Sequence, residues 1–176
     1  MLNKKLLMSL LGIGILAFSF NCSAKNIKLA VKLTKIQALK TTEAAGDEVY
    51  FSIAEYSSKS IPKLSREPMF PLHWLSKELP QISDVVLWQG ELAENDSVLL
   101  IMSLLEQDLE PWNSDDHIGS AQVKIANKNG KLVSKWGQPH FNDQPRVQQP
   151  DVAVPKFIMY GDGGKYVTVF KVEVLR

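Results

Sequence analysis

"SAQVKIANKNGKLVSKW" (residues 120–136) decides the fold class of this chain. Two runs of strand-forming residues flank Asn129-Gly130, and an Asn-Gly pair between such runs is the strongest short signal for a hairpin with a type I′ turn. "KFIMYGDGGKYVTVFKVEVL" (156–175) repeats the theme, with Gly161-Asp162-Gly163-Gly164 as its connection. The last third of the chain is therefore predicted to consist of antiparallel strands.

Strand-like runs continue toward the N-terminus. "SVLLIMSLLE" (97–106) is apolar on both faces, as expected of a central strand covered on both sides. "IKLAVKL" (27–33) alternates apolar and polar residues, and Ile36 breaks the alternation, which predicts a bulge near Thr34-Lys35. Two more strands are predicted within 48–56 and 84–92. The turn signals between these runs indicate an all-β fold, a single antiparallel β-sandwich of about eight strands.

Two segments fall outside this pattern. Residues 59–83 contain four prolines, and we predict an irregular insertion with one short helix around Leu72–Leu79. Residues 137–155 are rich in Pro, Gln and Asp and are predicted to form a long surface excursion. No internal repeat or clean boundary divides the chain, so residues 25–176 are expected to form one domain with irregular insertions.

The N-terminus has the three parts of a secretory signal peptide. Two lysines precede an uncharged apolar run (6–20), and a small-residue site follows at Cys22-Ser23-Ala24. The run of about 15 residues is shorter than the roughly 20 that a membrane span needs. We expect removal of residues 1–24 and export to the periplasm or out of the cell. Acylation of Cys22 in a lipoprotein is the alternative.

Composition excludes several functions for the processed chain. Loss of the leader removes two lysines from 20 basic residues, which leaves 18 against 19 acidic ones, so a broad nucleic-acid surface is not expected. The only cysteine, Cys22, is lost as well, which excludes an intramolecular disulfide, a zinc–thiolate site and a cysteine nucleophile. The three histidines share no metal-ligand spacing, and no G-x-S-x-G nucleophile elbow is present. We therefore predict that the chain is not an enzyme.

Acidic residues gather in two predicted loops. "LLEQDLEPWNSDDHIG" (104–119) follows an apolar strand, and in a strand residues two apart, such as Glu106 and Asp108, point to the same side. "TTEAAGDEVYF" (41–51) places Asp47 immediately before another strand. Calcium needs six to eight oxygen ligands, which closely spaced loop carboxylates can supply. A solvated acidic turn that keeps strand edges from pairing is the alternative.

These two stretches also resemble a known family. "GDEVYF" (46–51) is similar to the segment that leads into a strand of the C-2 domain, the calcium- and phospholipid-binding β-sandwich. "LLEQDLEPWNSDDHIGS" (104–120) resembles that family's later loop, with its acid-x-Asp and Asp-x-Ile-Gly elements. The resemblance, shared with secreted bacterial modules, implies a C-2-like sandwich over most of residues 27–176 with a turn at Gly119. It also implies the following metal ligands: Asp47, Glu106, Asp108 and Asp116, with Asp115 as an alternate.

Two tryptophans lie outside the strongest strand predictions. Trp112 falls within the acidic loop and Trp74 within the proline-rich insertion, and a tryptophan in an exposed loop marks a contact with a partner or membrane interface. We therefore expect an exported binding module, calcium-stabilised through loops 41–48 and 106–117, that recognises a protein, glycan or lipid surface. The alternative is an immunity-type inhibitor or secreted effector that acts by protein–protein contact without metal.

Overall fold

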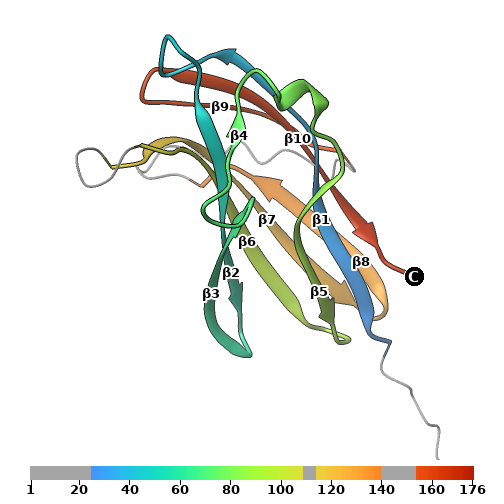
Figure 1. Cartoon of the computed structure of the whole chain (residues 1–176). Helices are drawn as coiled ribbons and strands as arrows, with labels where there is room; N and C mark the ends of the chain where they lie inside the picture. The colour runs from blue at the N-terminus through green and yellow to red at the C-terminus, as the bar shows by residue number, and fades with distance from the viewer. Residues whose placement is uncertain (1–24, 109–113, 140–153) are drawn as a thin grey trace, which may run out of the picture.

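The computed structural model describes residues 25–108, 114–139 and 154–176. Over these residues the chain is nearly all β, and two antiparallel sheets pack face to face, which confirms the predicted sandwich (Figure 1). The strands are β1 (Ile27–Lys40), β2 (Glu48–Ser57), β3 (Ser60–Glu67), β4 (Trp74–Leu75), β5 (Val85–Leu92), β6 (Ser97–Glu106), β7 (Asp116–Lys128), β8 (Lys131–Gly137), β9 (Lys156–Gly161) and β10 (Gly164–Val174), and one short 3-10 helix spans Leu79–Gln81.

The chain passes between the two sheets several times, and consecutive strands often belong to the same sheet. One sheet has four strands in the order β5-β1-β10-β9, and the other has six, with the order β3-β2-β6-β7-β8 and β4 paired to β2 beyond the end of β3. The first and last strands, β1 and β10, are neighbours, with a register that runs from Leu29 opposite Val174 to Lys40 opposite Lys165. No helix within the described ranges is long and apolar enough to cross a bilayer.

The core lies between the sheets and is built by alternate residues of each strand. Leu29, Val31 and Leu33 of β1 are fully buried, whereas Lys32 between them is only half-buried and Lys28 before them is exposed. Phe170 of β10 stands near the centre, where its ring lies 5.7 Å from Trp136 and 5.9 Å from Phe51. Aromatic contacts of this kind join the sheets, because Trp136 and Phe51 belong to the six-stranded sheet and Phe170 to the other.

Local sequence signals predicted several details of the backbone. The register of β1 against β10 shifts between Leu33 and Lys35, which confirms the expected bulge. Asn129 and Gly130 have φ of 51° and 77°, the values that a type I′ turn requires, and they connect β7 to β8. Gly161 pairs with Gly164 across the second hairpin, as expected.

Other expectations were wrong. Residues Leu72–Leu79 form no α-helix, because Trp74 and Leu75 pair with β2 and only Leu79–Gln81 make a 3-10 turn. The insertion also contains a strand, β3, which was not predicted because its sequence includes Pro62. β6 is central, but only one of its faces is buried: Leu99, Ile101 and Leu105 on the outer face are half-buried. Gly119 is no turn residue, since it lies inside β7.

Gly119 and Gly161 allow β9 to cross close to β7. A Cβ on Gly161 would lie 2.3 Å from the His117 carbonyl oxygen, and one on Gly119 would lie 2.9 Å from Met159 Cβ. Atoms at such distances overlap, so only glycine fits at either position without movement of the backbone. This crossing brings the β9–β10 turn next to the start of β7, where the acidic residues gather.

Candidate metal centre

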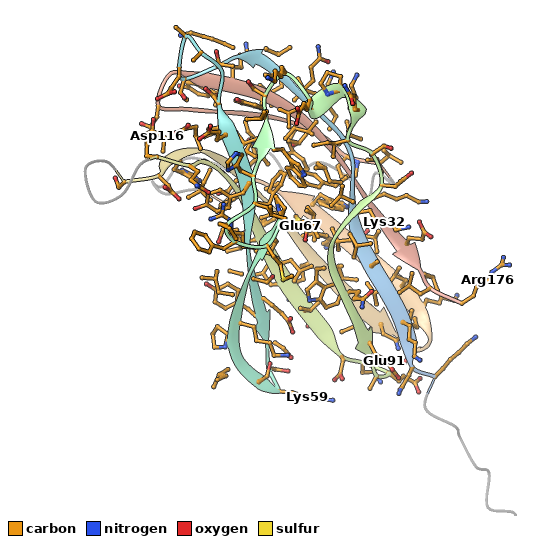
Figure 2. All side chains as sticks on the ribbon, viewed as in Figure 1. Lys32, Lys59, Glu67, Glu91, Asp116 and Arg176 are labelled. Atoms are coloured by element: carbon orange, nitrogen blue, oxygen red, sulfur yellow. The ribbon has the colours of Figure 1, made fainter. Side chains whose placement is uncertain are left out.

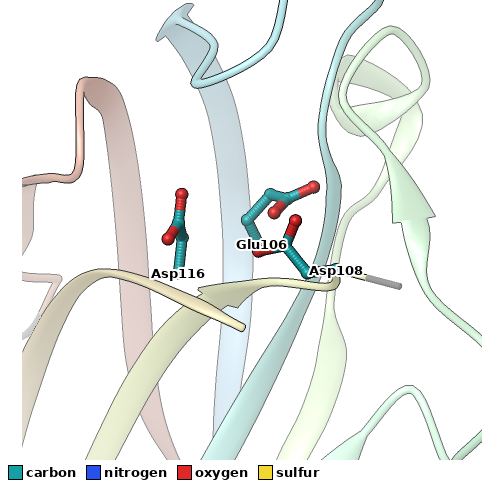
Figure 3. A group of neighbouring side chains, drawn as sticks. All are labelled: Glu106, Asp108 and Asp116. Atoms are coloured by element: carbon teal, nitrogen blue, oxygen red, sulfur yellow. The ribbon is translucent and has the colours of Figure 1, made fainter. Parts of the chain in front are cut away.

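Three carboxylates converge at one end of the sandwich. Glu106 ends β6, Asp108 follows it, and Asp116 begins the neighbouring strand β7, where it pairs with Glu106. Each offers an oxygen, and these oxygens lie within 4.8 Å of one another. Figure 3 shows the three side chains projecting to the same side of the ribbon. An acidic cluster of this size can hold a metal ion.

The electrostatics of the cluster favour either a proton or a cation. Glu106 is only 3% exposed. Burial raises its pKa to about 8, and the nearby charges of Asp108, Glu43 and Asp47 act in the same direction, whereas a backbone hydrogen bond from Glu48 opposes them. The pKa of Asp116 is also raised, first by desolvation and then by Asp108, Asp162 and Asp47. Two half-buried carboxylates thus surround one buried carboxyl group, Glu106, whose charged form needs a compensating cation.

Asp115 is held beside the cluster by two hydrogen bonds. Its Oδ2 accepts a hydrogen bond from the Tyr50 hydroxyl, and its Oδ1 accepts one from the Asp108 backbone N–H at 3.1 Å. Tyr50 is in turn covered by Arg66, whose guanidinium carbon lies 3.5 Å from the ring centre. Asp108 Oδ2, by contrast, is a buried oxygen that has no hydrogen-bond partner among the described residues. A buried carboxylate oxygen without a donor is costly unless a proton or cation occupies the site.

Asp47 is buried nearby but its oxygens are already engaged. Thr42 donates to it through its backbone N–H and its hydroxyl, both at 2.9 Å, and the Glu43 N–H donates at 3.0 Å. The Tyr166 hydroxyl also donates to Oδ2. The carboxylate of Asp47 therefore closes the 42–47 turn and ties it to β10. Neither Asp47 nor Asp115 is among the three carboxylates that converge.

The two predicted loops do lie together. The Gln107 backbone N–H donates to the Glu48 carbonyl at 2.7 Å, which links the end of β6 to the start of β2. The β9–β10 turn is the third element at this end, because Asp162 accepts a hydrogen bond from the His117 N–H at 3.1 Å. Asp162 raises the pKa of Asp116. The sequence predicts a turn at Asp162, but no local pattern indicates which end of the sandwich that turn reaches.

The two tryptophans predicted to contact a partner are placed differently. Trp74 lies in β4 and is half-buried, with its ring 6.4 Å from Phe51 in an edge-to-face arrangement. Trp112 lies outside the described residues. Partner binding by either tryptophan stays a prediction.

A scan with models of known protein families finds no match to this chain, and a comparison with curated proteins finds none either.

Proposed function

We propose that this chain is an exported, non-enzymatic binding module whose acidic end holds a calcium ion. The observation that carries the proposal is the convergence of Glu106, Asp108 and Asp116, whose oxygens lie within 4.8 Å of one another. The bound ion would stabilise the loops around it, and these loops would present the surface that recognises a protein, glycan or lipid partner.

The chemistry of the donors favours calcium over softer metals. All three side chains are carboxylates, and neither imidazole nor thiolate belongs to the cluster. Such oxygen donors suit calcium, magnesium or manganese, whereas zinc and copper sites prefer nitrogen and sulfur. Calcium accepts irregular geometry and six to eight oxygens, so carboxylates that bind through one or both oxygens, completed by water, satisfy it. Magnesium demands a near-ideal octahedron that three carboxylates on two strands are less suited to provide.

Thermal unfolding in calcium tests the proposal. An extracellular calcium site typically has a dissociation constant on the order of 10⁻⁴–10⁻³ M. Calcium at 10 mM would then add roughly 1.4–2.7 kcal/mol to the free energy of unfolding. For a domain of this size that corresponds to a rise in Tm of about 3–10 °C. Magnesium at the same concentration should give a smaller rise.

Matched Asp-to-Asn variants locate the effect. Asp108→Asn and Asp116→Asn should each abolish the rise, because each removes a charged ligand. Asp84→Asn, at an exposed aspartate that is not part of the cluster, should keep it. No rise with the wild-type protein would refute calcium binding. An equal rise in all variants would refute this site.

A second candidate function is favoured by another part of the surface. Residues 61–72 expose several large apolar side chains, which mark a site of contact with another protein. An inhibitor-type or effector protein that acts through this surface would need no metal. Recovery of a partner from an extract in chelator as well as in calcium would support this function over the first.

A further inference from the structure

β3 is an edge strand with an unusual surface. It pairs with β2 on one side, and none of the described strands pairs with its other side (Figure 1). Ile61 and Leu64 of β3 are 83% and 76% exposed, and Met69, Phe70 and Leu72 just beyond its end are also exposed. An edge strand normally avoids large exposed apolar residues, because they promote pairing with another strand. The surface of β3 is therefore suited to association.

The opposite edge of the same sheet shows the usual protection. β8 carries exposed Lys131 and Lys135, and its hydrophobic residues are half-buried or buried. Charged side chains on an edge discourage edge-to-edge pairing. Both edges of the six-stranded sheet thus carry charged side chains, but of the two described edge strands only β3 exposes large apolar residues.

We propose that two copies of this chain associate by antiparallel pairing of their β3 edges about a two-fold axis at Ser65. In an antiparallel pair of identical strands related by a two-fold axis, the residue on the axis faces its own copy. Residues equally far before and after it face each other. An axis at Lys63 would set two lysines against each other, which is unfavourable. An axis at Ser65 places Lys63 opposite Glu67 of the other copy, twice by symmetry.

The present contacts of Lys63 and Glu67 leave room for this pair. Lys63 reaches only a weak ion pair with Glu55, at 3.8 Å, and 63% of its side chain is exposed. Glu67 makes no salt bridge among the described residues, and burial raises its pKa, so a lysine beside it would stabilise its charged form. Figure 2 labels Lys59, which precedes β3, and Glu67, its last residue.

The same register covers the exposed apolar residues. Leu64 faces the aliphatic part of the Arg66 side chain of the other copy, and Ile61 falls beside the other copy's residues 69–72. Removal of these side chains from water supplies the main favourable term, at roughly 25 cal/mol per Å² of apolar surface. The Lys63–Glu67 pairs then select the register. The association needs no calcium, so it is tested separately from the metal site, and it assigns residues 61–72 to a second copy of the chain in place of a different partner.

Sedimentation velocity with charge-reversed variants tests the pairing. The wild-type chain should form a dimer, and Lys63→Glu or Glu67→Lys alone should weaken it about tenfold or more, since each sets like charges opposite one another. The double variant Lys63→Glu/Glu67→Lys should restore the dimer, because it recreates the pair with reversed signs. Lys131→Glu on β8 should leave it unchanged. A monomeric wild type, or a dimer that ignores these charges, would overturn the proposal.

A cysteine placed on the proposed axis gives an independent test. In the full chain with Cys22→Ser, Ser65→Cys should form a disulfide between copies under mild oxidation, because residues on the axis have Cα atoms about 4.5–5.5 Å apart. Ser60→Cys, an exposed residue at the other end of β3, should not form one. Equal cross-linking at both positions would contradict an axis at Ser65. Circular dichroism of each variant checks that the sheet is intact.

Discussion

Replacement of Glu106 by glutamine should make the metal-free protein more stable at alkaline pH. The pKa of Glu106 is raised from 4.5 to about 8 by burial and by neighbouring carboxylates. A carboxyl group with a raised pKa in the folded state contributes stability that is fully present below pH 4.5 and is lost as the pH rises through 8. Each pKa unit corresponds to 1.36 kcal/mol. The wild-type protein should therefore lose roughly 4 kcal/mol of stability from this residue between pH 4 and pH 9.

Glutamine has nearly the same shape and no charge at any of these pH values. Its carbonyl oxygen can accept the backbone hydrogen bond that Glu48 gives to Glu106. In chelator at pH 8.5 we expect Glu106→Gln to exceed the wild type by about 2–4 kcal/mol, and at pH 5 the two should be nearly equal. Calcium at 10 mM should narrow this difference, because the uncharged amide oxygen of glutamine binds the ion more weakly than a carboxylate does.

Urea unfolding, followed by tryptophan fluorescence at pH 5, 7 and 8.5, measures these free energies. Asp116 and Glu67 also have raised pKa values, so the wild-type slope contains their contributions too. The difference between wild type and Glu106→Gln isolates Glu106. Glu78→Gln, at an exposed glutamate, is the matched control. If Glu106→Gln kept the same dependence on pH as the wild type, Glu106 would not be the buried, proton-binding group described above.

Further substitutions test the scaffold by urea unfolding. Tyr166→Phe removes the hydroxyl that donates to buried Asp47 and should cost about 1–3 kcal/mol. Gly161→Ala puts a methyl group 2.3 Å from the His117 carbonyl oxygen and should cost about 1–3 kcal/mol or more. Asn127→Ala removes an amide that donates to the Lys25 and Leu92 carbonyls at 2.8 and 3.0 Å, with an expected cost of about 1–3 kcal/mol. A change below about 0.5 kcal/mol, typical of neutral surface substitutions, would contradict the stated role in each case.

Local patterns predicted the strands whose faces differ clearly in polarity. The bulge in β1 followed from a break in alternation at Ile36, and the β7–β8 turn followed from Asn129-Gly130. β3 was missed because "SIPKLSRE" is polar and contains Pro62. A proline is tolerated at a sheet edge, and the conformation of β3 is set by its pairing with β2. No pattern within eight residues reveals that pairing.

The acidic end was predictable only in part. Glu106 and Asp108 lie two residues apart, so a shared side followed from strand geometry. The role of Asp47 could not be inferred, because its partner Tyr166 is 119 residues away in the sequence. Its carboxylate was expected to bind metal, and its place between Thr42 and Tyr166 depends on the pairing of β1 with β10. Long-range sheet topology, which local composition does not encode, set this detail.

The pairing of β1 with β10 has a consequence for the time at which this protein can fold. The ribosome makes β1 well before β10, so the four-stranded sheet lacks one of its inner strands until β10 has been made. Contacts between distant parts of a chain form slowly, because the loop between them must first close. Under the export proposed above, this delay would favour passage of the unfolded chain through a translocation channel before β1 and β10 pair.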